Sequence, residues 1–381
     1  MLYIMYYCGM VLAGHSLGVR GGIMAVQTDN LETARLDAES ESDFRKRYKL
    51  MTELGPDIVD ALMKDRTAED VVVNPDGRVW IMRQGKPFEV LTQISPLRAV
   101  GATMSIAEGF GLVATYNSPV VSGNVPYLNC RVEALVAPVV PIGTASLSFR
   151  KKGEKKPSLY DYATSGILTN KEDPLNGLQS IDPFEQALRN SKNHVDVLFT
   201  AIEHHKNILV VGGTGSGKTT LLDALNQGIA ERTPHDRVLI LEDLPELRVA
   251  IENYVQLTAC KAVPMDDLIR SCLRMKPHRI LVGEVRGTEA LTAMEAWNTG
   301  HPGGSMTIHA NNAVEGLNRI VFLCQKTANP FPTHILARIV AETIHLVVYI
   351  EAGRQFPCGR KVKEVCLVKG HDGERFEIEQ L

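Results

Sequence analysis

A glycine-rich segment that ends in lysine and threonine is the clearest chemical feature of the sequence. Residues 212–219 read Gly-Gly-Thr-Gly-Ser-Gly-Lys-Thr, which has the G-x-x-x-x-G-K-[ST] spacing of a phosphate-binding loop. Glycines let the backbone wrap around a phosphate, and the N–H groups of a following helix favour its charge. In this pattern Lys218 reaches the β- and γ-phosphates and the Thr219 hydroxyl ligates Mg²⁺. The segment therefore predicts a site for a nucleotide and Mg²⁺.

Two glutamates further along the chain each follow a short apolar run. Glu242 ends Val-Leu-Ile-Leu-Glu, and Glu284 ends Arg-Ile-Leu-Val-Gly-Glu. Parallel strands place chemistry at their carboxyl ends, so both carboxylates should lie near the phosphate loop. A carboxylate there can hold the Mg²⁺ shell or orient and deprotonate the attacking water. The residues alone leave the division of these roles open.

Two histidines flank a glycine-rich turn, with His301 before it and His309 after a short apolar run. They lack a third ligand at a recognised spacing, which argues against zinc. We expect them to sense the γ-phosphate by hydrogen bonding, the alternative for His301 being a place near the core. Three arginines are either solvated or act across subunits: Arg270, Arg274 and Arg286.

The elements around these residues alternate between helical and strand patterns. An apolar strand over 207–211 leads into the phosphate loop, and an amphipathic helix over 218–231 follows it. Further helices are predicted at 183–205 and 288–299, and further strands at 237–241, 279–282 and 344–350. This alternation predicts an α/β domain with a parallel sheet.

The chain before the phosphate loop predicts a smaller α+β domain. Residues 31–65 have apolar positions at helical spacing, and Asn74-Pro-Asp-Gly77 lies between two β-rich runs, which indicates a hairpin. Short strands are expected at 111–116, 119–121 and 131–140. The predicted boundaries are 24–150 for this domain, 151–158 for a basic linker and 159–381 for the α/β domain.

Length and charge exclude several other classes of protein. The 381 residues predict about two domains. Basic and acidic residues balance, with 14 against 16 up to residue 150 and 27 against 28 after it, so neither part is a basic nucleic-acid module. The seven cysteines form no CxxC pair, which favours a reducing compartment and again argues against zinc.

The first 19 residues carry no Lys, Arg, Asp or Glu. They lack the basic start of a secretory signal, and glycines dilute them too much for a membrane span. We expect the domain to begin at Met24, with residues 1–23 a dispensable or untranslated extension.

Four segments together resemble the secretion ATPase family that powers type II secretion, type IV pili and type IV secretion, and most closely its conjugal transfer branch. They are GGTGSGKTT (212–220), LILEDLPEL (239–247), RILVGEVRG (279–287) and GHPGGSMTIHANNA (300–313). The resemblance extends to the hairpin near Asn74 and to the strands before residue 151, so it covers roughly residues 65–350.

The resemblance implies a hexameric ring of subunits, each with an N-terminal domain and a RecA-like ATPase domain that bind ATP and Mg²⁺ between them. It makes Glu242 the expected catalytic base, gives Glu284 the Walker B role beside Mg²⁺, and makes His301 and His309 the histidine-box members. The expected ATP-binding residues are Gly212, Gly213, Thr214, Gly215, Ser216, Gly217, Lys218, Thr219 and Thr220, together with Arg131 and Arg150 of the N-terminal domain.

Two positions depart from the expected pattern. Gly283 stands where most P-loop ATPases carry an Mg²⁺-ligating Asp, so Glu284 would act through water, and His278 stands where an acidic residue is expected. The expected function is Mg²⁺-dependent ATP hydrolysis that energises pilus assembly or substrate transfer in conjugative type IV secretion. The expected partners are five further copies and inner-membrane secretion components, with no direct nucleic acid and no membrane span, at the cytoplasmic face of the inner membrane. The alternatives are a RecA-like DNA motor and a nucleotide-gated scaffold that hydrolyses little ATP.

Overall fold

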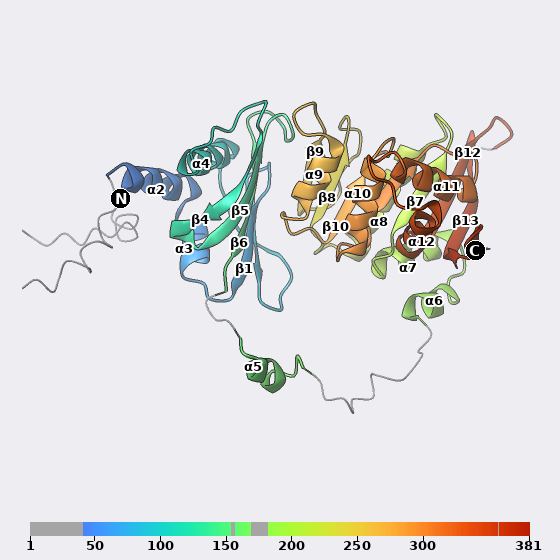
Figure 1. The fold of residues 1–381 in the computed structure, drawn as a ribbon, viewed down its shortest axis with the longest axis horizontal. Helices are drawn as coiled ribbons and strands as arrows, with labels where there is room; N and C mark the ends of the chain where they lie inside the picture. The colour runs from blue at the N-terminus through green and yellow to red at the C-terminus, as the bar shows by residue number, and fades with distance from the viewer. Residues whose placement is uncertain (1–40, 154–156, 169–181, 357) are drawn as a thin grey trace, which may run out of the picture. The chain divides into compact units, whose positions relative to one another are not determined.

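The computed structural model describes residues 41–153, 157–168, 182–356 and 358–381, so the predicted extension at 1–23 lies outside the described residues (Figure 1). The chain forms two compact units. Of the described residues, unit 1 comprises 41–81, 90–137 and 141–151, and unit 2 comprises 82–89, 138–140 and those from 152 to 381. In the described ranges, no helix is both long enough and apolar enough to cross a bilayer.

Unit 1 is built on a six-stranded sheet in the order β3-β2-β1-β6-β5-β4. Its strands are β1 (Ala68–Val73), β2 (Arg78–Arg83), β3 (Glu89–Gln93), β4 (Val120–Val125), β5 (Cys130–Val136) and β6 (Ala145–Lys151). Its helices are α2 (Glu41–Leu54), α3 (Pro56–Met63), α4 (Pro96–Gly109) and the short η1 (Pro126–Leu128). Apolar side chains of the helices and of one sheet face form a continuous core.

The predicted hairpin is confirmed, because β1 and β2 flank the turn at Asn74–Gly77. The Gly77 N–H donates to the Asn74 carbonyl at 2.9 Å. Gly77 has φ +85°, and a β-carbon there would lie 2.0 Å from the Ile94 carbonyl oxygen, so only glycine fits this turn.

The predicted strand at 111–116 is wrong, and the helix α4 was not predicted from the sequence. Ser95 caps α4 by accepting from the Arg98 N–H, and Pro96 occupies the first turn, which are ordinary signals for a helix start. After α4 the chain forms only an isolated bridge between Thr115 and Ser118. The apolar run 111–116 therefore has no partner strand, and Val113 is 73% exposed.

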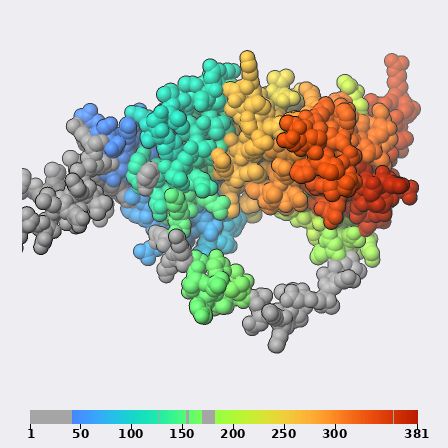
Figure 2. Space-filling model, viewed as in Figure 1, coloured from blue at the N-terminus to red at the C-terminus, as the bar shows by residue number. Residues whose placement is uncertain are grey.

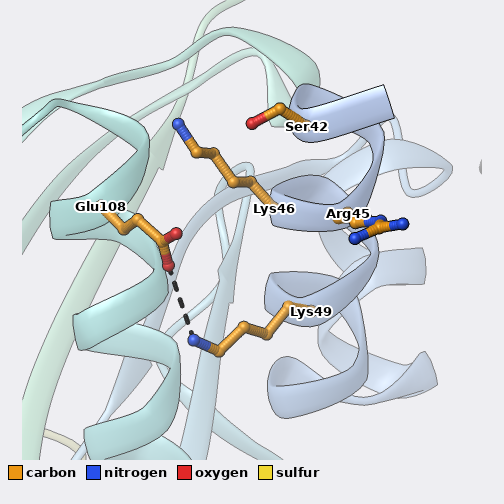
Figure 3. A pocket seen from close by; sticks show the side chains of 5 residues that line it. All are labelled: Ser42, Arg45, Lys46, Lys49 and Glu108. Carbon is orange, nitrogen blue, oxygen red and sulfur yellow. Dashed lines mark ion pairs between the residues drawn. The ribbon is translucent and has the colours of Figure 1, made fainter. Parts of the chain in front are cut away.

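A basic pocket lies between α2 and α4 in unit 1, and it is not part of the phosphate loop. Ser42, Arg45, Lys46, Lys49 and Glu108 line it (Figure 3). Lys49 pairs with Glu108 across the gap at 3.5 Å (Figure 3).

Unit 2 is built on an eight-stranded sheet in the order β14-β13-β12-β7-β11-β10-β8-β9. The strands are β7 (Ile208–Gly212), β8 (Val238–Glu242), β9 (Tyr254–Thr258), β10 (Arg279–Val282), β11 (Ser305–Ile308), β12 (Leu346–Ala352), β13 (Arg360–His371) and β14 (Phe376–Gln380). The parallel sheet is confirmed from β12 to β9. The strands β13 and β14 add an antiparallel edge that the sequence reasoning did not predict.

Helices cover both faces of this sheet. They are α6 (Pro183–Leu188), α7 (His194–Glu203), α8 (Lys218–Arg232), α9 (Met265–Cys272), α10 (Glu289–Asn298), α11 (Ala313–Cys324) and α12 (Thr333–Thr343). The short helix α5 (Leu159–Thr164) is not one of them, because it buries none of its residues. Ile208 and Val210 share a core with α7 and α8, whereas Gly316 of α11 packs against Val211 on the other face. The orange atoms of α10, α11 and α12 form the near surface of unit 2 in Figure 2.

The single helix predicted over 183–205 is two helices. The Asn193 side chain accepts from the N–H groups of Val195 and Asp196, at 2.9 and 3.0 Å, and so caps a new helix start. A mid-pattern asparagine that caps in this way was the missed signal.

The half-buried side chain of His345 makes the stability of unit 2 depend on pH. The Asn207 N–H donates to Nδ1 of His345 at 3.1 Å, and burial lowers the pKa of His345 from 6.5 to about 4. The neutral ring is therefore the folded form, and its contribution is complete above pH 6.5 and is lost as the pH falls toward 4. The pKa shift of His345 corresponds to a contribution on the order of 3 kcal/mol to the free energy of unfolding at neutral pH.

We expect the urea midpoint of His345→Gln to fall less steeply between pH 6.5 and pH 4 than that of the wild-type chain. His235→Gln is the control, because His235 is exposed. Equal slopes for His345→Gln and the wild-type chain would contradict the assignment.

Candidate functional site

The phosphate loop has the conformation that its glycines predict. Gly215 has φ +71° and Gly217 has φ +100°, and Gly217 lies at the N-cap of α8. A β-carbon at Gly212 would lie 2.4 Å from both the Ile350 carbonyl oxygen and Ser216 Oγ. The loop is thus a close-packed backbone turn whose N–H groups, with those of the first turn of α8, can face an anion.

Lys218 folds over this loop. Its Nζ donates to the carbonyls of Gly212 and Gly213, both at 3.0 Å, and lies 3.3 Å from Nδ1 of His309. Burial lowers the pKa of Lys218, and the charge of Glu284 opposes that change. The ammonium group is held where the loop binds phosphate, and an arriving γ-phosphate can replace its carbonyl acceptors.

His309 stands between Lys218 and Glu284. An ammonium group can only donate, so Nδ1 of His309 must accept, and the ring proton of the neutral form is on Nε2. Nε2 lies 2.8 Å from Oε1 of Glu284. Among the described residues, Oε1 of Glu284 is buried and makes no hydrogen bond. This oxygen therefore has unused capacity to accept a hydrogen bond.

Glu242 is held quite differently from Glu284. It is 4% exposed. Its Oε1 accepts from the N–H groups of Glu246 and Leu247, both at 2.9 Å, and its Oε2 accepts from Nε2 of Gln256 at 2.6 Å. Both oxygens are occupied by donors from the protein, so this carboxylate fixes the segment that follows β8. Gln256 was missed by the sequence reasoning, although a glutamine in the apolar strand β9 was a visible signal.

Gly283 has a steric reason to be glycine. β10 pairs with β8 so that Val282 lies opposite Leu241, and the Gly283 N–H donates to the Leu241 carbonyl at 2.8 Å. A β-carbon at Gly283 would lie 3.0 Å from Cγ of Glu242. An Asp at this position would therefore press on the side chain that organises the acidic segment.

Arg286 closes the acidic side of the site. Its guanidinium bonds to Oε2 of Glu284 and lies 3.5 Å from Asp243, and the hydrogen bond to Glu284 raises the pKa of Arg286. Its side chain is 66% exposed, so the group can reorient. Arg270, by contrast, pairs with Asp267 on its own helix.

One pocket brings the phosphate loop and the acidic residues together. It is lined by Thr219, Glu242, Asp243, Leu244, Glu246, Gly283, Glu284 and Arg286. A hydroxyl and carboxylates are the oxygen donors that Mg²⁺ prefers, and nucleotide phosphates usually complete its shell. Among the residues described, no group of three or more His, Cys, Asp or Glu could hold a metal. Thr219 and Glu284 fit Mg²⁺ that arrives with a nucleotide.

The structure does not bring His301 to this pocket. β11 separates the two histidines, because Ser305 pairs with Ile208 at the amino end of β7 and Ile308 pairs with Val211. The turn after His301 is fixed at that amino end by Oδ1 of Asn207, which accepts from Gly303 and Gly304 at 2.7 and 3.0 Å. Within one chain, His301 does not lie beside the phosphate loop. Burial lowers its pKa, as does the neighbouring Lys276.

His278 belongs to a buried polar network at the same amino end of the sheet. Its Nδ1 accepts from the Arg237 N–H at 2.8 Å. Next to it, Asp236 bonds to Nε of Arg279 at 2.6 Å, and Arg279 is 1% exposed. Burial lowers the pKa of His278. Because Nδ1 of His278 lies 3.9 Å from Oδ1 of Asp236, a neutral acceptor here avoids the repulsion that a second carboxylate would meet.

Arg131 and Arg150 lie in unit 1 as direct neighbours on β5 and β6. Both are exposed. They form a pair of adjacent cations, and their predicted contact with the nucleotide stays a prediction.

The fold and the site define a P-loop ATPase with an α/β nucleotide-binding domain. Residues 180–350 match the family described as "Type II/IV secretion system protein". The chain is 34% identical to the conjugal transfer protein TrbB of Rhizobium radiobacter over 331 residues, which cover 87% of this chain and 93% of the relative. It is 32% identical to the type IV secretion system protein VirB11 of Bartonella quintana, over 73% of this chain and 82% of that protein.

A solved structure agrees with these relatives. The VirB11 ATPase from the Brucella suis type IV secretion system, in complex with sulphate, superposes with a TM-score of 0.76 at 28% identity. The match covers 86% of this chain and 97% of the other. The chain belongs to the type II/IV secretion ATPase family, and its activity is ATP hydrolysis.

Proposed function

We propose that the chain is the Mg²⁺-dependent motor of a conjugative type IV secretion system and acts as a hexameric ring. The observation that carries this proposal is the 34% identity to a conjugal transfer protein over nearly the whole of both chains. The similarity to a type IV secretion ATPase across both units supports it. The work of such a ring would be pilus assembly or substrate transfer at the cytoplasmic face of the inner membrane, together with membrane components of the system.

The proposed chemistry divides the work among four side chains. Lys218 binds the β- and γ-phosphates, and Thr219 and Glu284 would hold Mg²⁺. When bound, Mg²⁺ would neutralise charge on the phosphates as the bond to the γ-phosphate breaks. Oε1 of Glu284, which makes no hydrogen bond within the described residues, would orient the attacking water and accept its proton, with His309 beside it. Glu242, whose oxygens are occupied, would position the acidic segment, which reverses the role expected from the sequence.

Arg131 and Arg150 would couple hydrolysis to motion. They are exposed cross-strand neighbours in unit 1, and two adjacent cations suit a polyphosphate. ATP would draw the two units together and release of the products would let them open, which is the usual logic of hinge closure around a ligand.

A mating assay tests the proposal. In a host that carries this gene within its own conjugative element, we expect deletion to abolish plasmid transfer. Expression of the wild-type chain should restore transfer, and Lys218→Ala should not. Transfer at wild-type frequency after deletion would contradict the role in conjugation, and turnover that depends on added DNA would favour a DNA motor instead.

A further inference from the structure

The β12–β13 hairpin brings an arginine to the phosphate loop. β12 runs parallel to β7 with Ile350 opposite Gly212, so its carboxyl end reaches the edge of the sheet where the loop lies. The chain then turns and enters β13 at Arg360, which pairs with Ala352. Arg360 is thus placed at this edge by strand pairing.

The guanidinium of Arg360 packs against the last glycine of the loop. A β-carbon built at Gly217 would lie 2.5 Å from Nη1 of Arg360 and 3.1 Å from its Cδ. Two features therefore favour glycine at position 217: its φ of +100° and the close approach of the Arg360 side chain.

Arg360 is a cation without a partner in the described part of the chain. Its guanidinium makes no hydrogen bond or ion pair there, and the residue is exposed. Arg286 differs, because Glu284 and Asp243 neutralise it. The five N–H donors of Arg360 are available to an anion that enters the loop.

The order of the strands tells which part of the nucleotide Arg360 faces. β12 and β13 lie on one side of β7, whereas β11, β10 and β8 lie on the other. Glu284 and His309 follow β10 and β11, so the γ-phosphate and its water belong on that side. Arg360 is on the opposite side of the loop, where the phosphate chain of a bound nucleotide would continue toward the nucleoside.

We propose that Arg360 binds the α-phosphate of the nucleotide and so contributes equally to the affinity for ATP and for ADP. The inference rests on nucleotide binding at this loop, and it adds a binding residue from the C-terminal hairpin. A charge-assisted hydrogen bond of this kind is worth about tenfold in affinity.

The test measures the Kd of the full chain by calorimetry for ADP, for the non-hydrolysable analogue AMP-PNP and for inorganic triphosphate. We expect Arg360→Gln to weaken all three by about the same factor of ten. Arg360→Lys should recover part of the loss. Arg354→Gln is the matched control, because it removes the same charge from the exposed tip of the same hairpin and should leave the three values unchanged.

Three results would overturn the inference: unchanged affinity for ADP in Arg360→Gln, a loss confined to AMP-PNP, or a loss for ADP with none for inorganic triphosphate. The second would place Arg360 at the γ-phosphate and the third at the base. Far-ultraviolet circular dichroism of each variant checks folding. A wild-type chain that binds no ADP would contradict the proposed motor itself, so the two failures are distinguishable.

Discussion

Lys218→Ala should reduce ATP turnover by about a hundredfold or more, since removing one preorganised donor to the charge that develops in the transition state costs about that much. Lys218 is the cation held over the phosphate loop, and within the described residues its Nζ contacts the carbonyls of Gly212 and Gly213 and Nδ1 of His309. Among the described residues, no lysine lines the pocket that joins Thr219 to Glu284, so no second ammonium group there can replace that of Lys218. Phosphate release at saturating ATP and Mg²⁺ measures the effect.

The control for this variant is Lys326→Ala, which removes an exposed lysine beside Phe322 on the far end of α11. It should retain wild-type turnover. Turnover by Lys218→Ala within a few fold of wild type would mean that hydrolysis occurs elsewhere in the protein.

Glu284→Gln should lower the rate of ATP hydrolysis by about a hundredfold or more, because a general base typically contributes that much. The substitution keeps the shape of the side chain and removes the charge beside His309 and Thr219. Because Glu284 would also hold the Mg²⁺ shell, half-maximal activity should require more Mg²⁺. The measurement is the turnover number as a function of Mg²⁺ concentration. Glu231→Gln, an exposed position on α8, is the matched control.

Glu242→Gln separates the two glutamates. The Glu242 carboxylate accepts from three donors: Nε2 of Gln256 and the N–H groups of residues 246 and 247. A glutamine has one oxygen and one NH₂ group, so its NH₂ would face a donor and leave it without an acceptor. We therefore expect local disorder in the acidic segment together with loss of activity. If Glu242→Gln stopped hydrolysis while Glu284→Gln hydrolysed ATP at the wild-type rate, the roles proposed for them would be reversed.

The phosphate loop, both glutamates and His309 could be placed from the sequence, because each follows a short apolar strand directly. A parallel sheet brings the carboxyl ends of its strands to one edge, so local signals were enough to gather these residues. The hairpin at Asn74–Gly77 was predictable for the same reason: its turn chemistry is contained in four residues.

The rest depended on contacts between distant segments. His301 precedes β11 and His309 follows it, so two histidines of one sequence box lie at opposite edges of the sheet. One of the three donors to Glu242 is Gln256, and Arg360, the arginine at the loop, lies 143 residues after Gly217 in the chain. Strand order decides these neighbours, and local pattern does not encode it.

Mg²⁺-dependent ATP hydrolysis at the phosphate loop is tested most directly by steady-state phosphate release from the purified full chain. With ATP present, the Mg²⁺ concentration is raised from zero, in an excess of EDTA, to saturation. We expect no phosphate release in EDTA, a rise to a plateau as Mg²⁺ is added, and no such rise in Lys218→Ala. Absence of Mg²⁺-dependent release by the wild-type chain, or an equal rise in Lys218→Ala, would contradict this expectation.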